Sequence, residues 1–442
     1  MSSQLPKPVV AALLFLCLAL LIAVFLAGVA VQRYKLPLYG LINEIELAVQ
    51  VSVEKTQGKR PWWFRDTAVT EPVNNRDGRA ADSGANLVSA MGEGTSLVLK
   101  LVDMAGEDLH SWHVDWFEVW PEPPGHLPTA EVPKARPGAQ IHGAHMFDDG
   151  RVVFNFERMS MVMMDACGEV LWKLPYRSHH SIYVDEAGTI WASGQNADLS
   201  RNERYPLMVE PVFEPEIVQV SQDGEILSRV SVMDLLDDNG LNAYLYMRAE
   251  TSSNRVKGDT LHLNDVDVFP GYLEEGLFKH GDVMLSLRNI NTVLVYDPQT
   301  LQVKWVKTGG FVRQHDPDFV DGNTITLFDN NAVGPDKFDQ QSRIIKIDAV
   351  TDEIEVVYEG SAAEPFYTRI MGKHQWLDNG HLLVSDSQNG RGFELNTDGE
   401  IVWEFFNLAG EGQASSMQTG AMQEIARYQQ MPAFLSGTSC NQ

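Results

Sequence analysis

The sequence is poor in cysteine. Its 442 residues include only Cys17, Cys167 and Cys440, which are too far apart to form a C-x-x-C metal or redox pair. This spacing excludes a disulfide-rich scaffold. It leaves two alternatives for the later cysteines, a single Cys167–Cys440 bridge in an oxidising compartment or buried thiols that pack as small hydrophobic side chains.

Positive charge is also scarce. The chain has 34 basic and 60 acidic residues, so its formal net charge is −26. A nucleic-acid binder needs a basic surface to replace phosphate counterions, and we therefore expect no nucleic-acid partner. With 44% hydrophobic residues, the chain is long and apolar enough to bury a large core, which excludes a disordered protein.

One long apolar run stands near the N-terminus. Residues 9–31 (VVAALLFLCLALLIAVFLAGVAV) contain no charge in 23 positions. About 20 apolar helical residues span a bilayer, whereas a cleaved signal peptide has an apolar stretch of about 7–15. We predict a single-pass signal anchor with the bulk of the chain on the periplasmic, extracytoplasmic side. Small residues at 28–30 keep cleavage as the alternative.

The pattern of residue types in the rest of the chain changes near residue 96. Residues 32–95 are predicted to form a juxtamembrane stalk helix, over 38–55, and a polar loop. From 96 to 436, short β-branched and aromatic stretches alternate with Asp-Gly and Asn-Gly turns, which indicates an all-β domain. Residues 1–8 and 437–442 remain as tails.

A strand motif recurs within this β region. Its copies begin at Gly106, Gly168, Gly224, Leu301, Asp352 and Gly399. Consecutive copies begin 47 to 77 residues apart. Repeats at such intervals are typical of four-strand units stacked around an axis. The repeat predicts a six-bladed β-propeller behind the N-terminal transmembrane helix and its short stalk.

Polar residues mark the start of a second recurring strand, as in HHSIYVDEAGTIW and HDPDFVDGNTITLF. In a propeller the innermost strands of successive blades line the central channel, so these residues are expected to converge. The candidates are His142, His145, His179, His180, His262, Asn264, His315, Lys373 and His374, with Arg288 in the strand after His262.

Converging residues of these types can have three roles: structural hydrogen bonding, zinc binding or anion binding. Histidines at strand starts often serve only as hydrogen-bonded structural residues. Three histidines around an axis can also bind zinc, but the sequence has no H-E-x-x-H, and Asn264 and Arg288 beside His262 suit an anion better than a cation. We therefore expect an anion site, with no metal and no cofactor.

The same residues carry a resemblance to a known family. The stretches HHSIYVDEAGTIW, LHLNDVDV followed by MLSLRNINTVLVYDPQT, and RQHDPDFVDGNTITLFDNN resemble bacterial arylsulfotransferases. The likeness covers about residues 140–436. It implies a six-bladed propeller that moves a sulfuryl group from an aryl sulfate to a phenol without a nucleotide donor.

The resemblance also implies roles for individual residues. His315 falls on the covalent nucleophile, which would become a sulfohistidine in a two-step transfer. His262 and Asn264 fall on a hydrogen-bonding pair and Arg288 on the anion-holding arginine, which suits a transition state whose charge spreads over nonbridging oxygens. His179 or His180 is expected to act as acid and base.

Four further residues have less definite roles in this scheme. Lys373 and His374 are expected to contact the substrate. Asp316 or Asp318 would orient the His315 ring or simply cap a turn.

Two other functions remain open from the sequence. The propeller could bind an anionic ligand or a protein partner without catalysis, because one fold hosts many functions. A metal-dependent hydrolase or lyase is the other alternative. A membrane-protein partner and a homo-oligomer are also considered. The discriminator is whether His262, Arg288, His315 and one of the adjacent pair His179 and His180 approach a common point.

Overall fold

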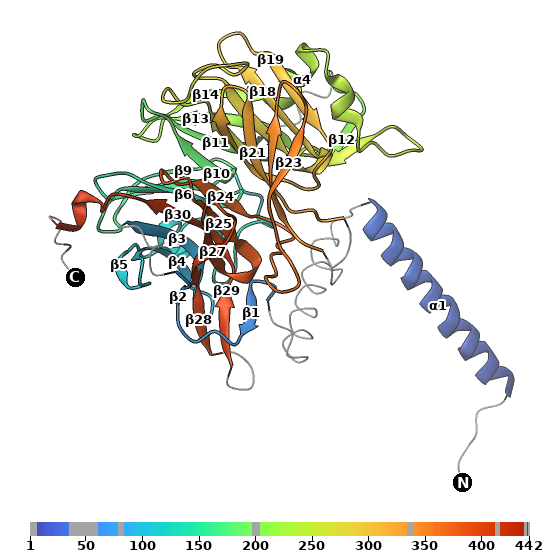
Figure 1. Ribbon diagram of the computed structural model, residues 1–442. Helices are drawn as coiled ribbons and strands as arrows, with labels where there is room; N and C mark the ends of the chain where they lie inside the picture. Colours follow the sequence, from blue (N-terminus) through green and yellow to red (C-terminus); the bar gives the residue numbers. More distant parts are fainter. Residues whose placement is uncertain are drawn as a thin grey trace. The chain divides into compact units, whose positions relative to one another are not determined.

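The computed structural model describes residues 7–34, 61–77, 84–196, 204–333, 340–411, 416–436 and 440 (Figure 1). The chain divides into two compact units, Met1–Trp62 and Trp63–Gln442. The first contains helix α1 (Lys7–Tyr34), which includes the predicted helical run of residues 9–31. Among the helices that the structure describes, none combines the length and apolarity that a membrane crossing requires, so the predicted transmembrane helix is not confirmed. The predicted stalk helix lies outside the described residues.

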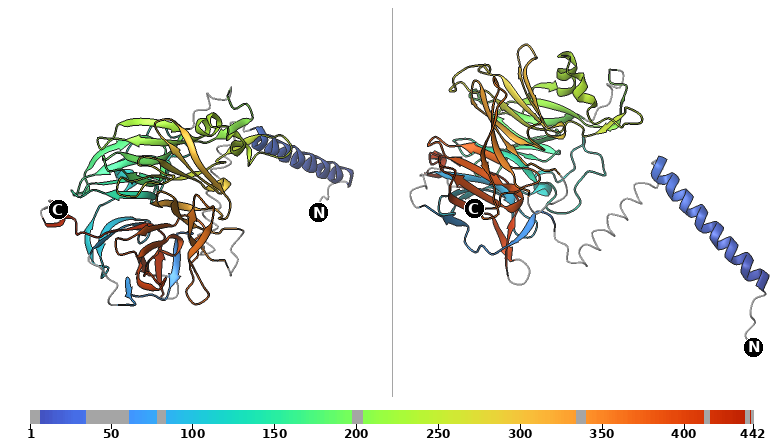
Figure 2. Two further views of the ribbon diagram at one scale, coloured as in Figure 1. Left: turned by 45° about the horizontal axis from the view of Figure 1, so that its top comes forward. Right: turned by 45° about the vertical axis from the view of Figure 1, so that its right-hand side comes forward.

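The second unit is mostly β, as predicted. Its described residues form six antiparallel sheets of four or five strands (Figures 1 and 2). The sheet that joins the two ends of the unit contains β30 (Met422–Tyr428), β3 (Ala85–Met91), β4 (Leu97–Asp103) and β5 (Asp108–Ser111). The next two are β6 (Ile141–Met146), β7 (Val152–Phe156), β8 (Ser160–Met164) and β9 (Val170–Leu174), then β10 (Ser178–Val184), β11 (Ile190–Asn196), β13 (Glu214–Val220) and β14 (Ile226–Ser231).

Three more sheets follow in chain order. They are β16 (Leu263–Val268), β17 (Val283–Leu287), β18 (Thr292–Asp297) and β19 (Gln302–Thr308), then β20 (His315–Asp321), β21 (Thr324–Asp329), β22 (Arg343–Asp348) and β23 (Ile354–Glu359), then β24 (Lys373–Trp376), β25 (Leu382–Asp386), β26 (Arg391–Leu395), β27 (Ile401–Phe406) and β2 (Val73–Asn75). Each of the six sheets has one strand that begins within a copy of the motif recognised in the sequence. These strands are β5, β9, β14, β19, β23 and β27.

The first strands of these sheets contact one another in sequence. β6 contacts β10, β10 contacts β16, β16 contacts β20 and β20 contacts β24, while β30 contacts both β24 and β6. The labels of β6, β10, β24 and β30 accordingly lie together in Figure 1. This closed series of contacts brings residues that are far apart in the chain to one place.

The cores lie between neighbouring sheets. Met284 and Val295 of one sheet pack with Ile325 and Ile345 of the next. All five residues of β17 are buried, because both of its faces are covered, whereas β9 is largely exposed at the outer edge. Burial on both faces explains why the middle strands read as continuous apolar runs.

Smaller elements complete the described part of the unit. They are β1 (Phe64–Thr67), β28 (Leu408–Glu411) and β29 (Met417–Gly420) in one sheet, β12 (Met208–Val212) and β15 (Val256–Gly258) in another, and the helices α3 (Trp116–Val119), α4 (Val232–Asp238), η1 (Asn242–Tyr246), η2 (Arg288–Ile290), η3 (Ser387–Asn389) and η5 (Ala433–Ser436). Because β3 and β2 precede residue 96 and pair within the main sheets, the compact β unit begins at Trp63 rather than at the predicted boundary. Cys167 and Cys440 form a disulfide, the first of the two predicted alternatives.

Candidate functional site

The inner strands share an irregular start. The register shifts at the beginning of β6, β10, β16 and β20. Near these points the backbone enters the left-handed region at Gly143, His180, His262 and Asp316. A Cβ at Gly143 would lie 2.1 Å from the His180 carbonyl oxygen, so only glycine fits there. Bulges of this kind re-aim side chains and are common beside active sites.

The histidines converge as the repeat predicted. The ring of His180 lies 4.1 Å from the ring of His142, 5.0 Å from that of His262 and 6.2 Å from that of His315, measured between centroids. Nδ1 of His179 is 2.7 Å from Nδ1 of His180, so the two rings share one proton between them. We call these five side chains the histidine cluster.

His315 is held in one tautomer. Its Nδ1 lies 2.7 Å from Oδ1 of Asn330 and 3.1 Å from the Arg313 carbonyl, and both partners are acceptors. Nδ1 therefore carries the proton. Nε2 then has the free electron pair, which accepts only a long hydrogen bond of 3.3 Å from the Met371 amide. Asn330, rather than the predicted Asp316 or Asp318, orients this ring.

Burial favours the neutral form of four of these five histidines. Burial, then the charge on Arg288, holds the pKa of His315 well below its usual value. Burial also holds the pKa values of His179 and His180 well below 6.5 and lowers that of His262 to about 4. An unprotonated imidazole at neutral pH is the form that can act as a nucleophile.

The acidic groups next to the cluster are paired. Nδ1 of His262 lies 2.5 Å from Oδ2 of Asp259, which also accepts from Nη2 of Arg158 at 2.9 Å. Burial opposes the charge on Asp259, but the hydrogen bond from His262 and the charges of His262 and Arg158 together outweigh it and leave the pKa of the carboxyl well below its usual value. Nε2 of His262, the opposite nitrogen of the ring, is buried without a hydrogen-bond partner.

Arg288 and Asn264 complete the predicted anion site. The Arg288 amide donates to the His262 carbonyl at 3.0 Å, which places the arginine next to the cluster. Asn264 is fixed by a 2.8 Å hydrogen bond from Nδ2 to the Gln314 carbonyl. Asn264 lines a small cavity with His180 and His315, whose free volume of about 10 Å³ is close to what one water molecule needs. Asn264, His180 and His315 thus share one cavity, and His262 and Arg288 lie next to it.

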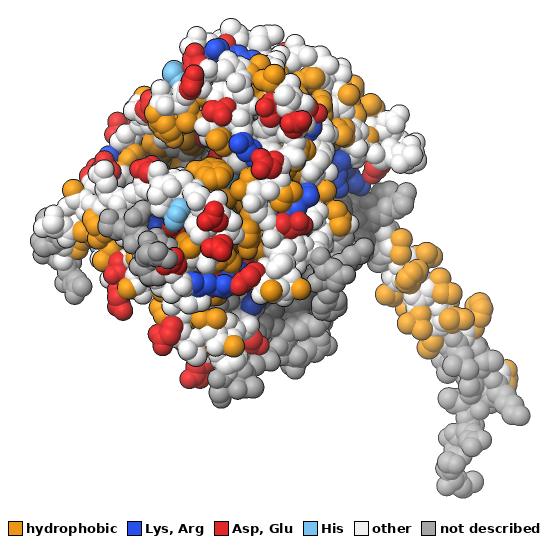
Figure 3. Space-filling model, in the orientation of Figure 1, with side chains coloured by type: hydrophobic (Ala, Val, Ile, Leu, Met, Phe, Trp, Pro, Cys, Tyr) orange, Lys and Arg blue, Asp and Glu red, His pale blue; other side chains and the backbone are white. Residues whose placement is uncertain are grey.

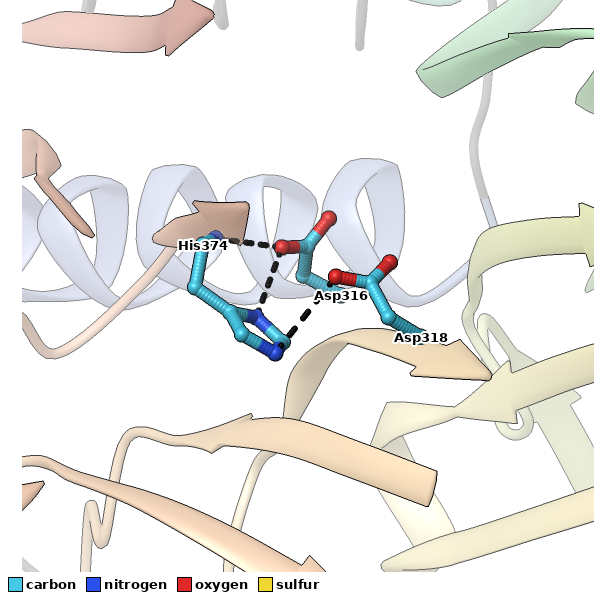
Figure 4. Close-up of side chains that lie close together, drawn as sticks. All are labelled: Asp316, Asp318 and His374. Carbon is cyan, nitrogen blue, oxygen red and sulfur yellow. Dashed lines mark hydrogen bonds and ion pairs between the residues drawn. The ribbon is translucent and has the colours of Figure 1, made fainter. Parts of the chain in front are cut away.

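Lys373 and His374 belong to a different group. Nζ of Lys373 donates to Asp316 at 2.9 Å and lies 3.9 Å from Glu424. Nδ1 of His374 lies 3.0 Å from Asp316 and its Nε2 lies 3.4 Å from Asp318 (Figure 4). His374 is fully buried by these contacts, so the structure does not place it against the histidine cluster.

These acids surround a second cavity of about 400 Å³. It is lined by Asp267, Asp316, Asp318, Glu424 and His145, together with aromatic side chains. Burial, then the neighbouring Asp265, raises the pKa of Asp267 to about 8. The ligand atoms of Asp316, Asp318 and His374 lie within 4.8 Å of one another, a spacing that suits a cation. Asp316 and Lys373 line both cavities, so their ion pair stands between the acidic and the histidine side.

Acidic side chains are also spread over the outer face shown in Figure 3. Against this acidic background the histidine cluster lies beside Arg288, and the acidic neighbours Asp259 and Glu157 are already paired. Sequence reasoning found most of the cluster but missed Asn330, Asp259 and Arg158. Asn330 lies at the end of the stretch RQHDPDFVDGNTITLFDNN, and Asp259 precedes His262 by three residues. Neither residue type repeats at the corresponding position of the other sheets.

Comparison with known proteins identifies the family of the chain. The sequence model of the family described as arylsulfotransferase (ASST) matches residues 143–408, which is more than half of the chain. The chain belongs to the arylsulfotransferase family. No curated protein matches it.

The solved structures that match the chain share little sequence with it. A Bacteroides caccae protein of unknown function is 12% identical over 78% of this chain and 99% of its own, with a TM-score of 0.48. TolB from Acinetobacter baumannii is 12% identical over 78% of this chain and 66% of its own, with a TM-score of 0.41. Virginiamycin B lyase from Staphylococcus aureus is 11% identical over 65% and 83%, with a TM-score of 0.35.

Proposed function

We propose that the chain transfers a sulfuryl group from an aryl sulfate to a phenolic acceptor through a sulfohistidine at His315. The observation that carries this proposal is the tautomer of His315. Its Nδ1 is protonated against Asn330, and its Nε2 offers an electron pair inside a cavity beside His180 and Asn264. The six sheets would be the blades of a propeller, with this cavity on the central axis.

The first half-reaction follows from this geometry. Nε2 of His315 attacks the sulfur, the N–S bond forms, and the bond from sulfur to the aryl oxygen breaks. The electron pair leaves with the phenolate oxygen. Arg288 and the N–H groups of neutral histidines face the nonbridging oxygens, where the negative charge of a loose transition state is spread.

The pair His179 and His180 would handle the leaving-group proton. Burial keeps both rings neutral in the empty site, but a bound sulfate ester places a negative charge beside them and raises their proton affinity. The pair would therefore take up a proton when the donor binds and give it to the departing phenolate. In the second half-reaction the acceptor phenol returns a proton to the pair, its oxygen attacks sulfur, and the N–S bond breaks.

A chromogenic aryl sulfate with a phenol acceptor tests the proposal. We expect phenol release that depends on the acceptor, and one added sulfuryl group on His315 after brief exposure to the donor alone. His315→Ala should lose both. The control is His381→Ala: His381 is not part of the histidine cluster, and its Nδ1 lies 2.7 Å from Oε1 of Glu394. This variant should keep both phenol release and the added sulfuryl group. Absence of phenol release by the folded protein contradicts the enzyme and leaves anion binding. Full turnover by His315→Ala contradicts the nucleophile.

We also propose that the second unit works in an oxidising compartment outside the cytoplasm. The Cys167–Cys440 disulfide supports this location, because such bonds persist where thiols are not kept reduced. Alkylation of thiols in intact cells, followed by mass analysis, should find both cysteines protected. Their alkylation in the native host would contradict the proposal.

A further inference from the structure

Arg313 lies beside Arg288 and shares a partner with it. Oδ1 of Asn289 accepts a 2.5 Å hydrogen bond from Nη1 of Arg313 and lies 3.4 Å from both Nε and Nη2 of Arg288. One amide oxygen therefore bridges two guanidinium groups. A guanidinium has five N–H donors, so this arrangement leaves most of the donors of both residues for another acceptor.

Neither arginine is neutralised within the part of the chain that the structure describes. The two carboxylates that act on Arg288, Asp259 and Glu157, have other partners: Asp259 contacts Arg158 and His262, and Glu157 contacts Arg158 and His142. Burial, then the charge on Arg313, lowers the pKa of Arg288 to about 10. Two adjacent cations without a carboxylate are unusual in a chain with 60 acidic residues, and they favour a bound anion.

The backbone at Arg313 is also unusual. Its φ is +62°, a conformation that non-glycine residues rarely adopt and that tends to persist at functional positions. Two contacts hold it there: the amide donates to Oδ1 of Asn291 at 3.0 Å, and the carbonyl lies 3.1 Å from Nδ1 of His315. The backbone of Arg313 is thus held in place by Asn291 and by the proposed nucleophile, His315.

Two more arginines lie toward the surface. The pKa of Arg313 is lowered by burial and then by the positive charges of Arg248 and Arg369. Both of these are exposed, whereas Arg313 and Arg288 are half-buried. Positive charge therefore extends from the surface to the cluster in a protein whose net charge is −26. Such a local field attracts anions and raises their rate of entry.

We propose that Arg313, bridged to Arg288 through Asn289, forms a second anion subsite that binds a carboxylate or another compact anionic group on the aryl substrate. This inference rests on the proposed function. Arg288 would hold oxygens of the transferred sulfuryl group, while Arg313 would bind the second anion through its planar fork of donors. The preferred substrate would then be an aryl sulfate with two negative charges.

Two matched donors test this subsite. They are 4-nitrophenyl sulfate and the same ester with one carboxylate on the ring. We expect the unchanged protein to favour the carboxylated donor in kcat/KM by about ten- to a hundredfold, the usual value of a hydrogen bond to a charged group. Arg313→Asn should abolish this preference, because it should lower kcat/KM for the carboxylated donor about ten- to a hundredfold more than kcat/KM for the singly charged donor. Asparagine is chosen because it tolerates a positive φ.

The control is Arg229→Gln, which removes one positive charge from an exposed side chain 4.0 Å from Glu216 in an outer strand. It should leave the preference intact. Arg313→Lys, which keeps the charge without the fork, should keep only part of it. A preference unchanged in Arg313→Asn, or an equal loss for both donors, would overturn the subsite.

A binding measurement separates this inference from the transfer reaction. Aryl sulfonates with and without a ring carboxylate cannot donate a sulfuryl group, and calorimetry measures their affinity directly. Tighter binding of the carboxylated sulfonate, lost in Arg313→Asn, supports the subsite even if neither ester is turned over. Equal binding of the two sulfonates by the unchanged protein overturns it, whatever the activity.

Discussion

Asn330 fixes which nitrogen of His315 can react. Nδ2 of Asn330 donates to the carbonyls of Thr368 and Met371 at 2.9 and 2.7 Å, so its Oδ1 must be the atom that faces the His315 ring. The amide is therefore oriented by two fixed acceptors. The proton on Nδ1 follows from this orientation, and the electron pair on Nε2 follows from the proton.

Changing Asn330 should affect catalysis more than folding. Asn330→Ala removes the acceptor for Nδ1–H, and we expect kcat to fall by about 10²–10⁴, the range seen when a catalytic histidine loses its orienting partner. The free energy of unfolding should fall by about 1–3 kcal/mol from the lost buried hydrogen bonds. Kinetics and urea unfolding on the same preparation measure both. Asn323→Ala, at the far end of the same β20–β21 hairpin, should change neither by much.

Asn330→Asp distinguishes orientation from mere packing. A carboxylate beside Nδ1 favours the imidazolium, so the pKa of His315 should rise and the loss of activity at low pH should begin at a higher pH. An acid limb of kcat/KM at the same pH as in the unchanged protein would show that Asn330 has only a structural role.

The activity of the unchanged protein should persist into acid. The pKa of His315 is lowered by burial and then by Arg288, so the neutral nucleophile is lost only when the pH falls through this lowered value. We expect kcat/KM not to fall as the pH is lowered from 8 to about 5.5, with no loss near the ordinary histidine pKa of about 6.5, while proton uptake by the pair His179 and His180 can only raise it. A pH profile with a saturating acceptor tests this. A tenfold drop between pH 7 and about pH 5.5 would contradict a buried neutral His315.

Asp267 should make the folded protein less stable as the pH rises. Its pKa is raised by burial and by Asp265 to about 8, whereas an unfolded aspartate titrates near 3.9. The folded chain therefore holds an extra proton between these values, and its stability falls as the pH rises through that window. Asp267→Asn removes this loss of up to about 1.4 kcal/mol per pH unit.

Urea unfolding at pH 5.5 and pH 8.5 measures this effect. Asp267→Asn should stabilise the protein at pH 8.5 relative to the unchanged chain and have a much smaller effect at pH 5.5. Asp297→Asn offers a control, because Asp297 is a partly exposed residue at the end of β18 whose pKa is lowered by the Gln299 amide. Equal effects of Asp267→Asn at both pH values would show that Asp267 is already ionised at pH 5.5.

The repeat explains how much of the site the sequence could predict. His180, His262 and His315 stand at corresponding strand starts, so radial contact between those strands brings them together. Lys373 also occupies such a position, but the bulge turns Asp316 toward it, and the ion pair removes its charge from the cluster. Burial and ion pairing depend on side-chain directions within each bulge. Neither periodicity nor composition carries that information, which is why the sequence did not predict the contacts of Lys373 and His374 with Asp316, whereas their contact with the substrate stays a prediction.

The disulfide should contribute directly to stability. Cys167 lies in the β8–β9 turn and Cys440 lies near the C-terminus, 273 positions later, so the bond restricts the unfolded chain over a long loop. We expect Cys440→Ser to lower the free energy of unfolding by about 2–4 kcal/mol. A reductant should destabilise the unchanged protein by a similar amount and have no effect on Cys440→Ser. Cys17→Ser changes the free cysteine of the first unit and should behave like the unchanged chain in both conditions. Equal stability of all three proteins without reductant would show that the bond does not restrict the unfolded state.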